Sequence, residues 1–373
     1  METKKRLLLI CDKNPCTSFG RLTLDTKKAL NSDYDVKIVW LTTPQYFSES
    51  PITDNLDESI AASSLYTGFF SFRKSLIPIA KSFAPDFVLF IRPELGFLVP
   101  IVKKAIPSSK VLVQVHDTFA ETLYPNSIKF KLINQFFIKN TVKADAYIFD
   151  SVYTQIEAQN HFKISNKPFC VLGCPINFNL FNKQQGIPTL EEKEAFRKQN
   201  NIVGFNGYCL NVSLDEPRKN LETFFEIAAV CPETAFVRIG KKTPRIEELI
   251  QKKELKNVFH FTEISADQLR DFYRHTDLVV YPSWLEGFGL PPLEALACGT
   301  PVVSSATSAL KENLEGVTPL VFPPDDVESY VAILKRRLAG DPLVDWDKAN
   351  ALLDRFSLKN ISERLINFLQ SLV

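Results

Sequence analysis

Short apolar runs alternate with longer amphipathic segments along nearly the whole chain. This alternation constrains the fold more than any other feature, because it is typical of βαβ units around a parallel sheet. In the first half we predict strands at Arg6–Cys11, Asp35–Leu41, Phe87–Ile91, Val111–Val115, Ala146–Phe149 and Phe169–Leu172. In the second half we predict strands at Tyr208–Val212, Ala235–Ile239, Val258–Phe261, Leu278–Tyr281, Val302–Ser304 and Leu320–Phe322. Helical spacing predicts helices at Thr23–Asn31, Ser127–Thr141, Leu221–Val230, Ala266–His275, Pro291–Cys298 and Val327–Leu338.

A polar stretch separates the two series of strands, and a chain of 373 residues is longer than one hydrophobic core normally supports. We therefore predict two doubly wound, Rossmann-like α/β domains, residues 1–178 and 187–356, with an interdomain cleft. The last segment, 357–373, has apolar residues at helical spacing and predicts an amphipathic helix. Ligands bind beyond the carboxyl ends of the strands in such sheets, so residues that directly follow a strand are the site candidates.

Charge and hydropathy exclude several classes of protein. The formal net charge is +1, so no nucleic-acid partner is expected. The apolar start, Leu7–Cys11, is too short for the core of a signal peptide or for a membrane span. Later apolar runs are interrupted by charges, so we expect a cytoplasmic protein without a transmembrane helix.

Cysteine and histidine are scattered. The seven cysteines are odd in number and no pair has zinc-knuckle spacing, so free thiols in a reducing compartment are expected. None of the four histidines lies at metal-ligand spacing from another. We therefore expect neither a metal site nor a cofactor.

The most informative segment begins at Tyr281 and reads Tyr-Pro-Ser-Trp-Leu-Glu-Gly-Phe-Gly-Leu-Pro-Pro-Leu-Glu-Ala-Leu-Ala-Cys-Gly-Thr-Pro. A strand ends there, a glycine-containing loop follows, and two prolines suit the first turn of a helix, where their missing N–H is not needed. The backbone amides of Phe288, Gly289 and Leu290 can then face an anion at the positive end of the helix dipole.

Two glutamates flank these amides. Glu286 lies on the loop, and Glu294, expected in the first helical turn, can accept hydrogen bonds from the vicinal hydroxyls of a ribose. Either glutamate alone is more typical of an ordinary strand–turn–helix. Their combination with the glycine loop and the double proline indicates a binding site.

Seven residues separate Glu286 from Glu294, and this spacing with its surrounding sequence resembles the E-x7-E motif of retaining glycosyltransferases of the GT-B fold, family 4 type. The resemblance implies a nucleotide-sugar donor. It places Glu294 on the ribose, Glu286 near the transferred sugar, and the amides of Phe288–Leu290 around sugar and phosphate.

The segment Asp215–Asn220 follows the first strand of the second domain, with Asn220 as a predicted helix N-cap. Lys219 looks like the family's diphosphate-binding lysine and can neutralise the charge that develops on the leaving group. Where the family usually has an arginine, this chain has Ser213. Arg218 is a candidate for the second cation, although neighbouring residues tend to face different ways. A solvated basic loop is the alternative.

The first domain offers weaker candidates. His116 and Asp117 end a predicted strand, and His116 resembles the family's active-site histidine, whereas a lone histidine at a strand end is more often structural. Gly20 opens a helix after the first strand and resembles a glycine–arginine loop of the family, where the backbone approaches the donor phosphate or the acceptor. A glycine needed only for turning is a near-equal alternative.

Two further regions have less specific signals. In the second domain Ile264 follows a strand, and the resemblance implies that its backbone contacts the nucleotide base. Tyr66–Lys81 and Ser127–Lys143 mix aromatic and basic residues, which suits a peripheral membrane contact or, equally, a core helix with a basic outer face.

The resemblance implies transfer of a hexose-type unit from a nucleotide-diphosphate sugar to a hydroxyl of a glycan or lipid-linked acceptor, with retained configuration and without a metal. A nucleotide-sugar epimerase of the same fold would use the same donor pocket. A binding-only protein also stays open because of Ser213, and a nicotinamide oxidoreductase is disfavoured because Cys11–Arg21 lacks its glycine fingerprint.

Overall fold

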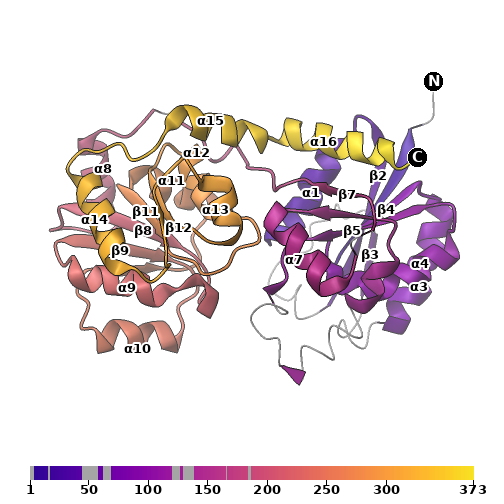
Figure 1. Cartoon of the computed structure of the whole chain (residues 1–373), viewed down its shortest axis with the longest axis horizontal. Helices are drawn as coiled ribbons and strands as arrows, with labels where there is room; N and C mark the ends of the chain where they lie inside the picture. Colours follow the sequence, from indigo (N-terminus) through magenta and orange to yellow (C-terminus); the bar gives the residue numbers. More distant parts are fainter. Residues whose placement is uncertain are drawn as a thin grey trace. The chain divides into compact units, whose positions relative to one another are not determined.

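The computed structural model describes residues 4–15, 17–43, 58–61, 69–119, 127–128, 138–164, 166–183 and 186–373. By contacts the chain divides into unit 1, Met1–Pro175 with Leu358–Val373, and unit 2, Ile176–Ser357 (Figure 1). The polar stretch expected to connect the domains begins inside unit 2, because Ile176 and Phe181 are buried there and the amide of Ile176 donates to the carbonyl of Phe356.

Unit 1 contains a parallel sheet in the order β3-β2-β1-β4-β5-β6-β7. Its strands are β1 (Lys5–Cys11), β2 (Tyr34–Thr42), β3 (Glu58–Ala61), β4 (Phe87–Phe90), β5 (Lys110–Val115), β6 (Ala146–Phe149) and β7 (Phe169–Val171). Its helices are α1 (Ser18–Leu30), α3 (Phe69–Phe83), η1 (Pro93–Leu98), α4 (Val99–Ala105), η3 (Lys139–Lys143), α7 (Val152–Phe162) and α16 (Leu358–Ser371).

Helices cover both faces of this sheet. One face packs against α3, α4 and α7 through a single apolar cluster that includes Phe72, Val102 and Ala158. Leu7 and Leu9 alternate with the strand residues of that cluster and are also fully buried, so they face the opposite layer. There α1 packs beside the C-terminal helix α16.

Unit 2 contains a second parallel sheet in the order β10-β9-β8-β11-β12-β13. Its strands are β8 (Gly207–Val212), β9 (Thr234–Ile239), β10 (Val258–Phe261), β11 (Leu278–Tyr281), β12 (Val302–Ser305) and β13 (Leu320–Val321). Its helices are α8 (Leu190–Gln199), η4 (Pro217–Lys219), α9 (Leu221–Val230), α10 (Pro244–Lys252), α11 (Ala266–His275), α12 (Leu290–Ala297), α13 (Ser308–Leu314), α14 (Val327–Leu338) and α15 (Trp346–Arg355).

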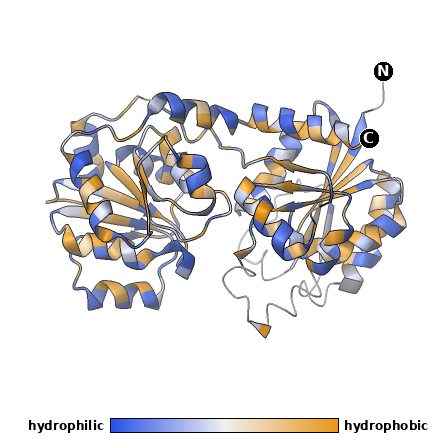
Figure 2. Cartoon of the chain, viewed as in Figure 1, coloured by the Kyte–Doolittle hydropathy of each residue, from blue (hydrophilic) through white to orange (hydrophobic). Residues whose placement is uncertain are grey.

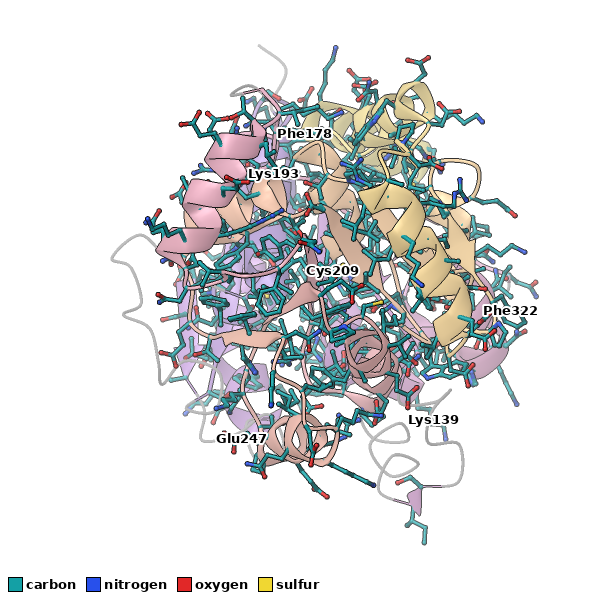
Figure 3. All side chains as sticks on the ribbon, turned by 90° about the vertical axis from the view of Figure 1, so that its left-hand side faces the viewer. Lys139, Phe178, Lys193, Cys209, Glu247 and Phe322 are labelled. Carbon is teal, nitrogen blue, oxygen red and sulfur yellow. The ribbon has the colours of Figure 1, made fainter. Side chains whose placement is uncertain are left out.

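The core of unit 2 lies between its sheet and the helices α9, α10 and α14. Cys209 of β8 lies in this interior, whereas Phe322, just after β13, lies at the surface (Figure 3). In both units the strands are mostly apolar and the helices carry polar residues along one side (Figure 2). That pattern is expected of parallel sheets covered on both faces.

The twelve predicted strands are confirmed to within a few residues at each end. The prediction missed β3, an edge strand in which Ile60 is the one buried residue, so no apolar run announces it. The helix predicted at Ser127–Thr141 is wrong at its described end, because Lys139–Lys143 forms a 3-10 helix; residues 129–137 lie outside the described residues. None of the described helices is long and apolar enough to cross a membrane.

Candidate functional site

The loop between β11 and α12 presents backbone donors at the carboxyl edge of the sheet of unit 2. Gly289 is the N-cap of α12 with φ +91°, and a Cβ there would lie 2.6 Å from Cδ2 of Leu310, so both the conformation and the space favour glycine. Among the described residues, none accepts a hydrogen bond from the amides of Phe288, Gly289 or Leu290. The next two residues are prolines and have no N–H. These amides therefore remain as donors at the positive end of α12.

Lys219, Arg218 and Glu286 form one ionic cluster beside this loop. The Nζ atom of Lys219 lies 2.7 and 2.9 Å from the two carboxylate oxygens of Glu286, and Arg218 Nη1 lies 2.9 Å from Oε2. The second guanidinium nitrogen of Arg218 pairs with Glu216 at 2.6 Å. Both cations therefore reach the same carboxylate, contrary to the expectation that neighbouring residues would face different ways.

The reason is the local backbone. Pro217–Lys219 forms the short 3-10 helix η4, whose tight turn brings both side chains toward the loop after β11. The carbonyl of Arg218 accepts hydrogen bonds from the amide of Trp284 at 2.7 Å and from Oγ of Ser283 at 2.8 Å. The strands β8 and β11, which precede these two segments, are neighbours in the sheet.

Burial and charge shift the pKa values of this cluster. Burial lowers the pKa of Lys219 below its ordinary value, and the attraction of Glu286 offsets only part of that effect. Burial alone would raise the pKa of Glu286, but Lys219 and Arg218 outweigh it and hold that pKa below its ordinary value. Lys219 also donates to the hydroxyl of Tyr281 at 3.1 Å. The cluster is thus a fixed, buried arrangement of charge next to the amides of α12.

Asn220 occupies the N-cap position of α9 but does not cap it as expected. Its backbone is left-handed, at φ 52°, and its side chain makes no capping hydrogen bond to the helix. Instead its amide nitrogen donates to the carbonyls of Pro282 and Pro324, at 3.0 and 3.1 Å. Asn220 therefore ties the segment after β8 to the ends of β11 and β13.

Glu294 is half-buried and accepts a hydrogen bond from the hydroxyl of Tyr273, with 3.0 Å between Oε2 and the phenol oxygen. Its expected place in the first helical turn is wrong, because α12 begins at Leu290, before both prolines. Phe288 is buried, and its ring packs edge-on against Phe356 with 4.8 Å between centroids.

Two other candidate positions of unit 2 follow strands of the same sheet. Ile264 is half-buried in the loop after the edge strand β10, whereas Glu286 follows β11, three strands along the order. Ser213 donates through Oγ to Oδ1 of Asn211 at 2.7 Å, and its carbonyl accepts from the buried guanidinium of Arg238 at 3.1 Å. An arginine is therefore packed against the backbone of Ser213, although the sequence has none at that position.

In unit 1, both ring nitrogens of His116 are engaged within the protein. Nδ1 lies 2.6 Å from Oδ2 of Asp150, and Nε2 lies 2.6 Å from the carbonyl oxygen of Ile91. The carbonyl oxygen of Ile91 can only accept, so Nε2 carries a proton, and a second proton on Nδ1 would pair an imidazolium with the carboxylate of Asp150. Burial alone would lower the pKa of His116, but Asp150 raises it above its ordinary value. His116 therefore links the residue after β4 to the residue after β6.

The other candidates of unit 1 are also tied to their own surroundings. Asp117 is half-buried and accepts from the amide of Phe119 at 3.2 Å. Gly20 lies inside α1, its amide donates to Oγ1 of Thr17 at 3.2 Å, and a Cβ would lie 2.0 Å from the carbonyl oxygen of Asn14. Packing against the preceding loop therefore requires a glycine at this position.

Some apolar residues of the two aromatic and basic stretches are buried, although Ile128 is exposed. Phe72 and Leu76 of α3 and Ile138 belong to the core cluster of unit 1, whereas Arg73 and Lys74 are exposed. This is the arrangement of a core helix with a basic outer face. Residues 66–68 and 129–137 lie outside the described residues.

Three residues of these networks were missed: Asp150, Tyr273 and Tyr281. Asp150 directly follows β6 and Tyr281 ends β11, so the rule that sites lie at the carboxyl ends of strands could have found both. Tyr273 lies inside α11, and no local pattern links it to Glu294. Within the described residues no group of His, Cys, Asp or Glu could hold a metal ion, and the six described cysteines are free.

Comparisons with known proteins fit this geometry. Residues 192–351 match the family described as Glycosyl transferases group 1. The O-antigen chain mannosyltransferase RfbU of Salmonella typhimurium is 27% identical over 270 residues, which cover 69% of this chain and 68% of that protein.

Two solved structures resemble the whole chain in fold. Sucrose-phosphate synthase from Thermosynechococcus elongatus has a TM-score of 0.78 at 18% identity and covers 99% of both chains. Anabaena HepE, solved in complex with UDP and glucose, has a TM-score of 0.77 at 16% identity and covers 98% of this chain and 100% of that chain. Residues 192–351 therefore match the model of a glycosyl transferases group 1 domain, and the chain has the GT-B fold of two Rossmann-like α/β domains.

Proposed function

We propose that this chain is a retaining, metal-independent glycosyltransferase. It transfers a hexose-type unit from a nucleotide-diphosphate sugar to a hydroxyl of a glycan or lipid-linked acceptor. The observation that carries the proposal is the convergence of Lys219 and Arg218 on Glu286, beside the donor amides at the start of α12. Mannose is the first sugar to test, since RfbU is an O-antigen chain mannosyltransferase.

Each group has a role in this reaction. Lys219, Arg218 and the amides of Phe288–Leu290 stabilise the negative charge that develops on the leaving diphosphate. Glu286 accepts hydrogen bonds from the transferred sugar, and Glu294 accepts them from the ribose hydroxyls of the nucleotide.

The bond changes balance without a protein nucleophile. The bond between the anomeric carbon and the phosphate oxygen breaks through a dissociative transition state. The acceptor oxygen bonds to the same face of the sugar, and its proton passes to the departing phosphate oxygen. The products are a glycoside and a nucleoside diphosphate. Because fixed cations neutralise the leaving group, no metal ion takes part.

Two candidates of unit 1 act less directly. His116 contributes the positive charge that Asp150 and the carbonyl of Ile91 hold in place, and Asp117 beside it is available to orient an acceptor hydroxyl. Ile264 remains the candidate for a backbone contact with the nucleotide base.

The test is a panel of GDP-, UDP- and ADP-linked mannose, glucose and galactose, screened first by thermal shift, since a ligand of the folded state raises its stability. Donors that bind are then incubated with glycan and lipid-linked acceptors in the presence of EDTA, and the product is analysed by NMR. The expected result is a glycoside with the anomeric configuration of the donor, formed at an unchanged rate with EDTA. Epimerised donor without transfer, an inverted product, or no donor binding would contradict the proposal.

A further inference from the structure

The phenol of Tyr273 donates a hydrogen bond to Oε2 of Glu294 across 3.0 Å, and it comes from a different helix. Tyr273 lies on α11, whereas Glu294 lies on α12, the helix whose start carries the proposed phosphate donors. The Tyr273 side chain is fully buried and Glu294 is only half-buried. The hydroxyl therefore reaches the carboxylate from the interior of unit 2.

Tyr273 is itself held rigidly. Its ring packs edge-on against Phe181, with centroids 5.8 Å apart and planes at 76°. Its carbonyl oxygen accepts a hydrogen bond from Oγ1 of Thr300 at 2.6 Å, which ties α11 to the residue just beyond α12. Burial, together with the charge of Glu294, raises the pKa of Tyr273 well above its ordinary value. The phenol therefore keeps its proton and acts as a constant donor.

A glutamate on a helix surface has several side-chain rotamers, and a ligand that needs one of them must supply the ordering free energy. A hydrogen bond from a rigid buried donor selects the rotamer before the ligand arrives. The carboxylate keeps further lone pairs, because each of its two oxygens can accept more than one hydrogen bond.

We propose that Tyr273 is a positioning residue for nucleotide recognition, whose hydroxyl fixes the Glu294 carboxylate in the orientation that accepts the two ribose hydroxyls of the donor. This inference rests on the proposed function of the same site. It assigns to Tyr273 the preference for a ribonucleotide, although Tyr273 itself does not touch the nucleotide.

The test uses Tyr273→Phe, which removes one oxygen and keeps the ring. The matched control is Tyr330→Phe, since Tyr330 is also a buried tyrosine of unit 2 and no described residue hydrogen-bonds to its hydroxyl. Calorimetric titration of the full chain with GDP and UDP, and with their 2′,3′-dideoxy counterparts, gives the preference for the ribose hydroxyls. Turnover of the donor sugar gives KM and kcat separately.

For Tyr273→Phe we expect Kd for the preferred ribonucleotide to rise about tenfold, because a hydrogen bond to a charged group is lost. Kd for the dideoxy counterpart should stay within about twofold, KM for the donor should rise about tenfold, and kcat should stay within about twofold. Tyr330→Phe should change none of these ratios.

Equal weakening of both nucleotides by Tyr273→Phe, or no weakening of either, overturns the inference and leaves the proposed function standing. The same holds if the wild-type protein binds ribo- and dideoxynucleotides equally well. If the wild-type protein binds neither GDP nor UDP, and none of the GDP-, UDP- and ADP-linked donors of the panel, the inference and the proposed function fail together.

Discussion

The ammonium of Lys219 lies between both carboxylate oxygens of Glu286, at 2.7 and 2.9 Å, and both side chains are buried. This pair joins the segment after β8 to the loop after β11, so it holds two neighbouring strand ends together. A diphosphate bound at the start of α12 would share the charge of Lys219 with Glu286. The cation is thus oriented before substrate arrives, and little reorganisation is needed when negative charge develops.

Replacing Glu286 by glutamine should destabilise unit 2. The substitution keeps the shape of the side chain but leaves Lys219 and Arg218 buried without their shared carboxylate, so we expect a loss of about 3 kcal/mol. The control is Glu247→Gln, which breaks an exposed pair with Lys242 and should change the stability far less. Thermal and urea unfolding of the two variants measure the difference. Equal losses of stability in the two variants would contradict the conclusion that Glu286 stabilises unit 2 as part of a buried ionic cluster.

The stability that Glu286 contributes should depend on pH in a defined direction. Lys219 and Arg218 hold its pKa below the ordinary 4.5 against the opposing effect of burial. A carboxyl group whose folded pKa is depressed stabilises the fold fully above its unfolded pKa, and this contribution is lost as pH falls through the folded value. The stability difference between wild type and Glu286→Gln should therefore be constant above about pH 5 and shrink below about pH 4. A difference that grew toward acid would refute the assignment.

The stability that His116 contributes should depend on pH in the opposite direction from that of Glu286. Its pKa is raised above the ordinary 6.5 because Asp150 outweighs burial. A base with a raised folded pKa stabilises the fold fully below its unfolded pKa, and the contribution disappears as pH rises through the folded value. The stability lost in His116→Gln should therefore be largest in mild acid and decline at alkaline pH. NMR titration of the His116 imidazole checks the direction of its pKa shift.

Alanine substitutions at Gly289 and Gly340 distinguish the effect of backbone strain on stability from an effect on nucleotide binding. Both have a positive φ, +91° and +101°, but a Cβ at Gly289 would lie 2.6 Å from Leu310, whereas one at Gly340 would meet nothing within 4 Å. Each alanine substitution should cost about 1 kcal/mol of stability or somewhat more. Only Gly289→Ala should also weaken nucleotide binding, by about tenfold or more, because it displaces the amides at the start of α12. Unchanged affinity in that variant would argue against the amide site.

The sequence predicted the strands well because a parallel strand buried on both faces appears as an apolar run in the sequence. The edge strand β3 was not predicted, because Ile60 is its single buried residue and the strand has no apolar run. The sequence grouped Glu286, Gly289 and Glu294 as one candidate site because they lie on one short segment. Contacts between distant segments were not predicted from the sequence. The hydrogen bond from Tyr273 to Glu294 and the pairing of His116 with Asp150 depend on the packing of elements that lie far apart in the chain. Arg218 and Lys219 both reach Glu286 because they lie in a 3-10 turn. No sequence pattern indicated this turn, so the two neighbouring side chains were expected to face different ways.

We propose above that Lys219 and the start of α12 bind the diphosphate of a nucleotide sugar. Calorimetric titration with GDP against GMP, and with UDP against UMP, measures this directly in the wild-type protein and in Lys219→Met, in which Glu286 keeps Arg218 as a partner. We predict that the wild type prefers the diphosphate of one base by about tenfold or more, and that Lys219→Met loses most of that preference. Equal affinity of the wild type for diphosphate and monophosphate, or a preference that survives in Lys219→Met, would contradict the account.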